Sequence, residues 1–493
     1  MNSFKTLFFS FLANNISLLS SKMYKNIQFY KKYLYFEKIL KINCVIIEKI
    51  YTEGSVEMEN LQEIYKKHEP KNFIEPELYP LHRVKQGLRN DNGTGVKVAL
   101  TKVSTVIGYD VIDGHKKNLE GRLVYRGYNV EDLVSYYEKM NIFGFERTAF
   151  LLIFGKLPTQ EEIESFHNEL LTIATNTMTD FSYKTSSIMN AMQIGVLKLY
   201  GNDENPDNDT LEQRMIKGIH ILSSLPLFVF SYYTDVHAKT YWETYPLPNK
   251  SFAENILYMA RETRIYTPEE VSLVDKLLIV HADHGGGNNS TFTDVVISST
   301  GTDIYSCIAA SIGSLKGPKH GGAAMKTYEQ FKFISEQYGY ITDEKTIEEI
   351  CNKILDKEYY DNSGLIYGIG HAVYTKSDPR ATIIKEECRK LAKEKGTTMM
   401  NAFEFYSTFE RVAVRVMKER KGMTVCANVD FYSGLAYRML GFRKEIFTPL
   451  FAIARTSGWI AHHLESRQSD RKLIRPAAVY VGKYRNVEEE NND

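Results

Sequence analysis

The stretch Ile304-Tyr-Ser-Cys-Ile-Ala-Ala-Ser-Ile-Gly-Ser-Leu-Lys-Gly-Pro-Lys-His320 sets the fold class expected for this chain. Its isoleucines and its leucine recur every three or four positions, which is the spacing of one buried helix face. The pattern stops at the Gly-Pro pair, where a helix ends. His320 follows directly and is flanked by further glycines. The stretch therefore predicts a core helix that leads into a loop with a titratable side chain.

Helical spacing dominates on both sides of this stretch. Ile347, Ile350 and Ile354 repeat it downstream, and residues 150–157 keep it upstream as far as Pro158. Thr159 then precedes an acidic first turn and is expected to cap another helix.

The best strand candidates are residues 105–112 and 122–125, which flank Asp113-Gly114 and could pair as a hairpin. One short hairpin among many helices predicts an all-α protein. Residues 201–209 and 245–249 are expected to form exposed loops.

Composition excludes several classes of protein. With 493 residues, 43% of them hydrophobic, the chain can bury a large core and form two or more domains. It carries 61 basic and 61 acidic residues, so no net charge favours nucleic acid or an anionic membrane. We expect neither as a partner.

The five cysteines form no CxxC pair and lie mostly in apolar or helical stretches. They are expected to be buried free thiols in a reducing compartment, and a cytoplasmic location is predicted. These cysteines are Cys44, Cys307, Cys351, Cys388 and Cys426.

Residues 1–57 differ from the rest of the chain. An apolar run after Lys5 resembles the core of a signal peptide, but no clear cleavage site follows and Asn14-Asn15 interrupts the run. Met58 opens a more ordinary beginning. The leader is therefore expected to lie outside the fold, as a dispensable extension or a start-site error, with a targeting segment as the alternative. The acidic tail 487–493 is expected to be solvated.

Histidines beside glycines are the first functional candidates. His281 and His284 would share a face on a helix and could chelate a metal, but no third ligand is evident and no metal is predicted. A lone histidine is more often a core residue. His320 and His371, however, are flanked by Gly and Pro, which favours a functional role. The preceding Gly-x-Gly at 368–370 is no dinucleotide fingerprint, because Val373 replaces the third glycine.

Asp430 and three arginines have both structural and functional interpretations. Asp430 could cap a helix, or it could serve as a general base if it is partly desolvated. Arg380, Arg455 and Arg475 could pair with surface carboxylates. Arg455 lies in the apolar run 451–460, where an unpaired guanidinium is costly, so it requires an anion from the protein or a substrate.

The chain resembles the citrate synthase family from about residue 95 to 482, and as a set the shared segments are highly specific. They are His281 through Ser290-Thr-Phe-Thr-Asp to Gly317-Pro-Lys-His-Gly-Gly, Gly370-His-Ala-Val-Tyr, Asp378-Pro-Arg-Ala, Asn428-Val-Asp-Phe-Tyr-Ser-Gly, Ala454-Arg-Thr-Ser-Gly-Trp-Ile-Ala-His, Arg475-Pro, and upstream Leu123-Val-Tyr-Arg-Gly-Tyr, Asp132-Leu and Phe154-Gly-Lys-Leu-Pro-Thr.

This resemblance implies an all-α homodimer in which a small domain closes over the substrates of a large domain. The large domain would comprise residues 58–319 and 433–493, and the small domain residues 320–432. The implied reaction condenses acetyl-CoA with oxaloacetate and hydrolyses the thioester to citrate and CoA, with acetyl-CoA as a substrate and no cofactor.

The resemblance also implies a role for each site residue. Asp430 would be the base, His320 the donor to the enolate oxygen, and His371 the group that polarises the oxaloacetate carbonyl. The remaining assignments are oxaloacetate binding by His284, Arg380, Arg455 and, from a partner subunit, Arg475, and CoA binding by Gly368, Gly370 and Lys376.

One position departs from the family pattern. Family members usually carry Asn where this chain has Ala324, after Gly-Gly-Ala, which puts rate or domain closure in question. Two alternatives stay open: a 2-methylcitrate synthase that uses propionyl-CoA, and a catalytically silent paralogue that binds CoA or a carboxylate. The extra methylene of propionyl-CoA changes binding by only about 1–3 kcal/mol, so a few pocket residues would decide the substrate.

Overall fold

The computed structural model describes residues 61–63, 65–66, 69, 73–177, 185–238, 240–468 and 472–484. The predicted leader 1–57, the start at Met58 and the acidic tail 487–493 lie outside these residues. The chain divides into two compact units, Met1–Gln86 and Gly87–Asp493. In the first unit the short helix α3 spans Leu78–Leu81, and the turn η2, Gln86–Leu88, spans the boundary.

The sheet of the second unit is the predicted hairpin with one short addition. Strands β1 (Ser104–Ile112), β2 (His115–Tyr125) and β3 (Tyr128–Asn129) pair antiparallel in that order. Asp113 and Gly114 form the turn with φ of 50° and 77°, the positive values that a tight two-residue hairpin turn requires. The hairpin prediction is confirmed, and β2 extends back to the turn. β3 was not predicted, because two residues carry no alternation to detect.

The remaining elements are helical, which confirms the all-α prediction. Their bounds are α4 Val130–Lys139, α5 Phe145–Phe154, α6 Gln160–Asn176, α7 Ile188–Asn202, α8 Leu211–Val236, α9 Phe252–Ala260, α10 Pro268–His281, α11 Asn289–Ser298, α12 Ile304–Lys316, α13 Ala323–Tyr338, α14 Glu344–Leu355, α15 Pro379–Lys395, α16 Thr397–Lys421, α17 Val429–Met439, η3 Lys444–Ile446 and α18 Phe447–Gln468.

Three helix predictions are confirmed in detail and one is wrong at its end. α12 ends before the Gly-Pro pair, and α14 contains the isoleucine repeat. Thr159 forms a capping box with Glu162 at the start of α6. The helix expected to run to Pro158 ends at Phe154, because Gly155 adopts φ 81° and caps it in the left-handed conformation.

The loop and cysteine predictions hold in part. Residues 203–210 form a loop, but Gly201 and Asn202 still belong to α7. Residues 245–249 are irregular as expected, although Pro246 is buried. All four cysteines in the described residues are buried free thiols, as predicted, and Cys44 lies outside those residues.

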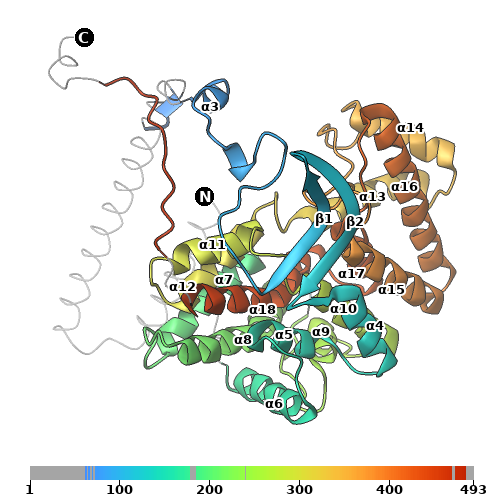
Figure 1. Ribbon diagram of the computed structural model, residues 1–493. Coiled ribbons are helices and arrows are strands. Elements are labelled where there is room, and N and C mark those ends of the chain that lie inside the picture. Colours follow the sequence, from blue (N-terminus) through green and yellow to red (C-terminus); the bar gives the residue numbers. More distant parts are fainter. Residues whose placement is uncertain are drawn as a thin grey trace, which may run out of the picture. The chain divides into compact units, whose positions relative to one another are not determined.

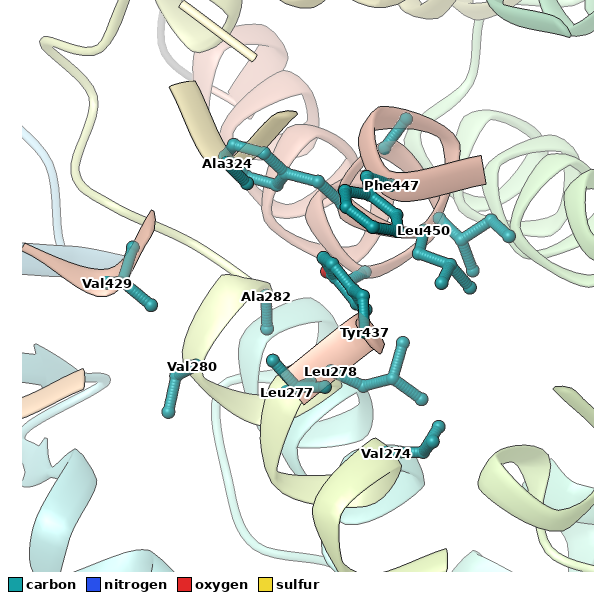
Figure 2. Packing of buried hydrophobic residues seen from close by; sticks show 14 of the residues in the cluster. Val274, Leu277, Leu278, Val280, Ala282, Ala324, Val429, Tyr437, Phe447 and Leu450 are labelled. Atoms are coloured by element: carbon teal, nitrogen blue, oxygen red, sulfur yellow. The ribbon is translucent and has the colours of Figure 1, made fainter. Parts of the chain in front are cut away.

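The helix α18 runs through the centre of the core, and most of its residues are buried, Trp459 completely. Figure 2 shows side chains of α10, α17 and α18 packed together with Ala324 from the start of α13. Among the described residues, α8 is the one helix long and apolar enough to cross a membrane, but 78% of its most apolar window is buried inside the protein. A single mostly buried helix of this kind is typical of a protein core.

Figure 1 shows how the helices of the second unit are arranged around the hairpin β1–β2. Helices α13 to α17 gather on one side, while α5 to α8, α11, α12 and α18 lie on the other. The boundaries of a small domain over residues 320–432 stay a prediction. Three of the candidate histidines lie in loops: His284 between α10 and α11, His320 between α12 and α13, and His371 between α14 and α15. Arg380, Asp430 and Arg455 lie on the helices α15, α17 and α18.

Candidate active site

His320 lies in a tight turn between α12 and α13. The backbone N–H of Gly321 donates to the carbonyl of Leu315, 2.9 Å away, and folds the turn back on the helix. A Cβ atom on Gly321 would lie 2.3 Å from that carbonyl oxygen, so only glycine fits. The glycines around His320 therefore shape the turn that presents the ring.

Ser290 holds one side of the His320 ring. The backbone N–H of Ser290 donates to Nε2 at 3.4 Å, and its Oγ lies 3.0 Å from the same atom. Trp459 Nε1 in turn donates to Ser290 Oγ at 3.1 Å. Because Nε2 accepts an N–H hydrogen bond, the neutral ring carries its proton on Nδ1. Burial and the charge of Arg455 lower the pKa of His320 to about 4, so the ring is neutral at pH 7.

His371 follows two glycines with left-handed backbone. Gly368 and Gly370 have φ of 83° and 99°, and a Cβ atom on Gly368 would lie 2.9 Å from Phe431. The Nδ1 atom of His371 accepts hydrogen bonds from the backbone N–H groups of Val373 and Tyr374, each 3.1 Å away. The neutral ring of His371 therefore carries its proton on Nε2.

The environment of His371 also keeps it neutral. Burial and the charge of Arg380 lower its pKa to about 4, and the ring stacks on Tyr374 with centroids 4.8 Å apart. His284 meets both of these rings edge-on, with its centroid 5.1 Å from that of His371 and 5.7 Å from that of Tyr374. The two catalytic candidates His320 and His371 are thus both neutral, with their protons on opposite ring nitrogens.

Asp430 lies in the first turn of α17 and is not its cap. The cap is Asn428, whose side-chain oxygen accepts from the backbone N–H of Asp430 at 3.0 Å. The capping interpretation of Asp430 is therefore wrong, because the helix starts two residues earlier than that interpretation requires. Burial raises the pKa of Asp430 to about 6, although the charges of Arg380 and Arg455 act in the opposite direction.

The two buried arginines differ in how they are paired. Arg380 forms a bidentate ion pair with Asp378, with Nε at 3.0 Å and Nη2 at 2.7 Å from the carboxylate oxygens. Burial acts to lower the pKa of Arg380, but this carboxylate outweighs it and raises the pKa above its usual value. Asp378 also accepts from the backbone N–H of Val429, and so joins Arg380 to the start of the helix that carries Asp430.

Arg455 is 1% exposed, yet among the described residues its one side-chain hydrogen bond runs from Nε to the carbonyl of His281 at 2.8 Å. Its Nη1 atom is buried and has no partner among the described residues. Burial lowers its pKa to about 10. A buried guanidinium with an unused donor is an arrangement that a substrate carboxylate would complete, and such a carboxylate is one of the two anion sources that the sequence left open.

His281 and His284 do not share a helix face, because α10 ends at His281. His281 Nδ1 donates to the carbonyl of Leu277, and burial lowers its pKa to about 3. His284 lies beyond the helix, and its buried Nε2 has no hydrogen-bond partner among the described residues. The i, i+3 chelation considered for this pair is therefore wrong.

The electrostatics of His284 show which side chains come together. Its pKa is well below its usual value because of burial and because of the nearby groups Arg380, His371, Arg455 and His320. The charge of Asp430 in turn acts on both Arg380 and Arg455. Six of the predicted residues thus form one cluster: His284, His320, His371, Arg380, Asp430 and Arg455.

Arg475 and Lys376 are exposed, and neither makes a hydrogen bond or ion pair with this cluster among the described residues. Arg475 lies in the extended segment 472–480, which a hydrogen bond from Ile474 to Ser299 ties to the end of α11. Lys376 is exposed on the loop that follows His371. Gly368 and Gly370, by contrast, form the backbone that leads into His371.

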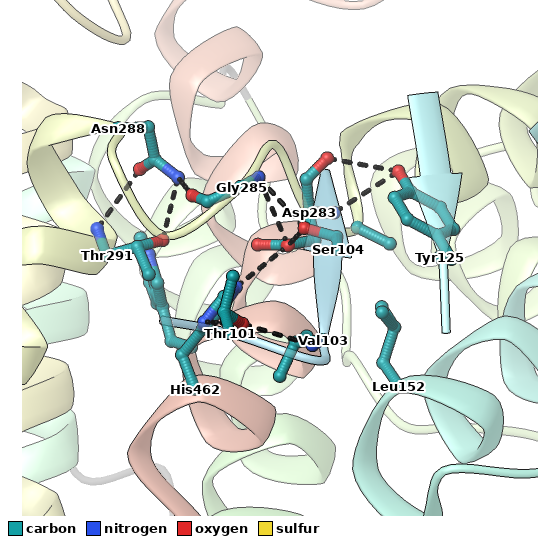
Figure 3. A network of polar contacts seen from close by, with 12 residues as sticks. Thr101, Val103, Ser104, Tyr125, Leu152, Asp283, Gly285, Asn288, Thr291 and His462 are labelled. Carbon is teal, nitrogen blue, oxygen red and sulfur yellow. Dashed lines mark hydrogen bonds and ion pairs between the residues drawn. The ribbon is translucent and has the colours of Figure 1, made fainter. Parts of the chain in front are cut away.

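Sequence reasoning gave no role to several residues that support the cluster. Asp283 is fully buried and accepts hydrogen bonds from Ser104 and from His462, the latter at 3.0 Å (Figure 3). Burial alone would raise the pKa of Asp283, but His462, Arg455 and Ser104 hold it below its usual value. This network fastens the loop after α10 to β1 and α18.

Of these supporting residues, Asp378 is the one whose role a local sequence pattern indicates. Asp before Pro at a helix start is a capping pattern, and Asp378 does cap α15. Ser290, Trp459 and Asp283 act through contacts between segments that lie far apart in the sequence, and no local pattern indicates such contacts.

A second group of possible metal ligands lies apart from these residues. Asp294, Cys307 and His463 are buried and their ligand atoms lie within 4.8 Å of one another. His463 Nδ1 donates to Asp294 at 3.0 Å, and its Nε2 accepts from Arg214 at 2.9 Å. Both ring nitrogens are thus engaged, and the adjacent guanidinium charge opposes a cation. His463, Asp294 and Arg214 thus form a buried chain of hydrogen bonds beside Cys307.

Comparison with known proteins shows the family to which this chain belongs. The family model described as citrate synthase, C-terminal domain, matches residues 91–477. The chain belongs to the citrate synthase family. The citrate synthase of Saccharolobus solfataricus is 33% identical over 397 residues, which is 79% of this chain and 95% of that protein. Citrate synthase 2 of Bacillus subtilis is 34% identical and the match covers 74% of this chain and 91% of that protein.

Solved structures of citrate synthases resemble this fold. The enzyme of Thermotoga maritima aligns with a TM-score of 0.64 and 29% identity, over 83% of this chain and 99% of that chain. The enzyme of Thermoplasma acidophilum, solved as a ternary complex with carboxymethyl coenzyme A and oxaloacetate, aligns with a TM-score of 0.65 and 27% identity, over 82% and 99%.

Proposed function

We propose that this protein condenses acetyl-CoA with oxaloacetate and then hydrolyses the thioester, giving citrate and free CoA. The observation that carries the proposal is the composition of the cluster. A carboxyl group whose pKa is raised to about 6 lies beside two buried arginines and near two histidines that burial keeps neutral. A weak carbon acid needs its base and its oxyanion donor in place together, and this cluster offers both.

Asp430 acts as the base of the first step. Its carboxylate removes a proton from the methyl group of acetyl-CoA, and a raised pKa makes it a stronger base than an ordinary aspartate. His320 donates a hydrogen bond from Nδ1 to the developing enolate oxygen, because Ser290 occupies its Nε2.

His371 acts on the second substrate. Its Nε2–H points away from the backbone groups that occupy Nδ1, and donates to the ketone oxygen of oxaloacetate. The enolate carbon attacks that ketone carbon and the new carbon–carbon bond forms. The alkoxide takes the Nε2 proton of His371, and the proton held by Asp430 then replaces it, which returns both residues to their starting states. Water then cleaves the thioester and releases CoA as the thiol.

The positive charge of the cluster fits a dicarboxylate. Arg380 and Arg455 carry two buried positive charges, and only Arg380 has a protein carboxylate in bidentate contact. The unused Nη1 of Arg455 is a donor that an oxaloacetate oxygen would engage, and Nε2 of His284 would be a second one in the tautomer that carries the proton on this nitrogen. Acetyl-CoA is expected along the backbone of Gly368 and Gly370, with Lys376 near its phosphates. The oxaloacetate and CoA analogue bound by the Thermoplasma acidophilum enzyme support these two substrates.

A homodimer with shared sites completes the proposal. Arg475 is exposed in its own chain, as expected for an arginine that reaches the site of a partner subunit. Mixing Arg475→Leu subunits with Asp430→Asn subunits tests this, because one site of each heterodimer then combines an intact base with an intact Arg475. Recovery of activity on mixing supports a shared site, and two inactive parents that stay inactive together contradict it.

The proposed reaction needs no resident cofactor, because arginine and histidine side chains supply the positive charge and hydrogen bonds that it requires. We also propose a cytoplasmic location, in keeping with four buried thiols and no disulfide among the described residues. Cell fractionation tests the location, and activity after exhaustive chelation tests the absence of a metal requirement.

Release of free thiol is the experiment that tests the reaction. Purified protein is incubated with oxaloacetate and either acetyl-CoA or propionyl-CoA, and the thiol is measured with a chromogenic reagent. Faster release from acetyl-CoA supports the proposal, faster release from propionyl-CoA indicates a 2-methylcitrate synthase, and no release indicates a silent paralogue. Ala324 is 7% exposed and belongs to the hydrophobic core, so Ala324→Asn in the same assay measures what the unusual residue does to the rate.

A further inference from the structure

The pairing of β1 with β2 is irregular at one place in the hairpin. Ile107 pairs with Arg122, but the next pair along the strands is Tyr109 with Asn118. Gly108 on β1 therefore faces the three residues 119–121 on β2 without a regular partner. Bulges of this kind bend a strand and often lie next to active sites, where they redirect a side chain.

The irregularity is the place where the hairpin meets the loop that follows His371. A Cβ atom on Gly108 would lie 2.5 Å from the carbonyl oxygen of Val373, and one on Gly121 would lie 2.1 Å from that of Ser377. Neither glycine has a positive φ, so backbone conformation does not explain them. The two glycines are explained by the close approach of the loop.

Hydrogen bonds fix the loop at this place. Ser377 Oγ donates to Glu120 Oε2 at 2.6 Å and accepts from the backbone N–H of Gly121 at 3.0 Å. The hydroxyl of Tyr374 donates to the carbonyl of Arg122 at 3.4 Å. Three consecutive residues of β2 thus hold two residues of the loop.

The held loop is the one that orients His371. The backbone N–H groups of Val373 and Tyr374 donate to His371 Nδ1, and the Tyr374 ring stacks on the imidazole. Any shift of the loop relative to β2 moves these donors and the stacked ring together. The position of the imidazole therefore depends on contacts that Tyr374 and Ser377 make three and six residues further along the chain.

We propose that the irregular part of the hairpin is a seat for residues 373–377, and that Ser377, held by Glu120 and Gly121, is a positioning residue for His371. The proposal rests on the proposed function. Ser377 does not touch the substrates; it fixes the loop so that His371 Nε2–H meets the ketone oxygen. Misplacement of a reacting group by about 1 Å can cost on the order of 100-fold in rate, so a small shift of the seat is expected to be measurable.

Three pairs of variants test the seat in the full-length enzyme. Ser377→Ala removes both hydrogen bonds, and Ser377→Thr keeps the hydroxyl. Glu120→Ala removes the exposed acceptor, and Glu120→Gln keeps an oxygen in its place. Gly121→Ala adds the Cβ atom for which there is no space, and Gly201→Ala, with nothing within 4 Å, is the matched control.

We expect kcat to fall about tenfold in Ser377→Ala and about 100-fold in Gly121→Ala, with a smaller change in KM for acetyl-CoA that arises because Lys376 lies in the same loop. Glu120→Gln is expected to keep more activity than Glu120→Ala, and Gly201→Ala to match the wild type. The nitrogen-15 signals of His371 should shift in Ser377→Ala while those of His320 stay in place. A purely structural role would lower the melting temperature and leave kcat and the His371 signals unchanged.

Wild-type kcat and unchanged His371 signals in both Ser377→Ala and Glu120→Ala would overturn the proposal. These two variants decide the matter even if Gly121→Ala does not fold, because Glu120 is exposed and Ser377 loses only a hydroxyl. A wild-type protein that releases no thiol would instead overturn the proposed function, so the two failures are distinguishable.

Discussion

The loops that carry His320 and His371 hold the same kind of side chain in two different ways. His320 is held from outside its own loop, by the backbone and hydroxyl of Ser290 on α11. His371 is held from within its loop, by the backbone N–H groups of Val373 and Tyr374. In the first ring the occupied acceptor is Nε2, and in the second it is Nδ1.

This difference gives His320 and His371 different donor nitrogens. A neutral imidazole has one donor and one acceptor, so occupying the acceptor decides which nitrogen donates to a substrate. The charges beside the rings differ as well, because Arg455 lowers the pKa of His320 and Arg380 lowers that of His371. Each histidine thus has its own anchor and its own arginine, and each can be altered alone.

Asp430→Asn is expected to have the largest effect, because it removes the base that both histidines serve. The change keeps the shape of the side chain, so oxaloacetate binding should largely survive while thiol release falls about 100- to 10,000-fold. The measurement compares kcat with the dissociation constant for oxaloacetate. A variant that keeps most of its activity would show that Asp430 is not the base. Asp356→Asn, at an exposed ion pair with Arg420, is the control.

The pH dependence of kcat is expected to follow Asp430 and neither histidine. Asp430 accepts a proton only when ionised, and burial raises its pKa to about 6, so kcat should fall about tenfold per pH unit below 6 and level off above it. Both histidines must be neutral, and their pKa values of about 4 keep them so above pH 5. A profile recorded from pH 5 to 8 checks this. Constant kcat down to pH 5 would mean that Asp430 is not desolvated.

Arg455→Leu is expected to weaken oxaloacetate binding and to change the pKa of only one of the two histidines. Loss of a charge-assisted hydrogen bond worth about 1.5–3 kcal/mol should weaken oxaloacetate about 10- to 150-fold, with little change for acetyl-CoA. The same change should raise the pKa of His320 and leave that of His371 in place, since Arg455 acts on the first ring. Titration by nuclear magnetic resonance and substrate kinetics check both parts.

Arg415→Leu, at an exposed arginine paired with Glu344, is the control for Arg455→Leu. Equal losses for oxaloacetate and acetyl-CoA would contradict a role for Arg455 in carboxylate binding.

Ser290→Ala tests the anchor of His320 with a smaller expected effect. The change removes one of the two contacts to Nε2 and leaves the indole N–H of Trp459 without its partner, at a cost of about 0.5–1.5 kcal/mol per hydrogen bond. We expect kcat to fall about 2- to 10-fold. Nitrogen-15 spectra of the wild type should show the proton of His320 on Nδ1 and that of His371 on Nε2. A proton on the other nitrogen of either ring would contradict the tautomers that distinguish His320 from His371.

The sequence predicted the helices and the hairpin well, because buried helix faces and a two-residue turn leave periodic and local signals. Local signals also pointed to His320, His371 and Arg455, because histidines beside glycine and an arginine in an apolar run are unusual outside functional sites. The family resemblance supplied the roles of His284, Arg380 and Asp430. Helix ends were less certain: Gly155 ends α5 before the periodicity does, and Asn428 caps α17 ahead of Asp430.

The anchors of the two rings could not be predicted from the sequence. Ser290 lies 30 residues before His320 in the chain, and Glu120 lies more than 250 residues before Ser377. Such contacts exist only after α11 packs on α12 and the hairpin meets the loop. The local spacing of residues carries no information about these contacts. The requirement for glycine at positions 108 and 121 likewise becomes visible only when the neighbouring backbone is in place.

Removal of residues 1–57 is expected to have the smallest effect, because neither histidine loop lies there and the anchors found among the described residues all lie further along the chain. The family match begins at residue 91, and the apolar and aromatic leader has no partner evident from its sequence, which makes it a liability for solubility. A chain that begins at Met58 should express, dimerise and release thiol within about twofold of the full-length rate, with the His320 and His371 signals unchanged. Two results would show that the leader has a function: a truncated protein that fails to fold, or a full-length protein that is cleaved and moved to an organelle or membrane in its own cell.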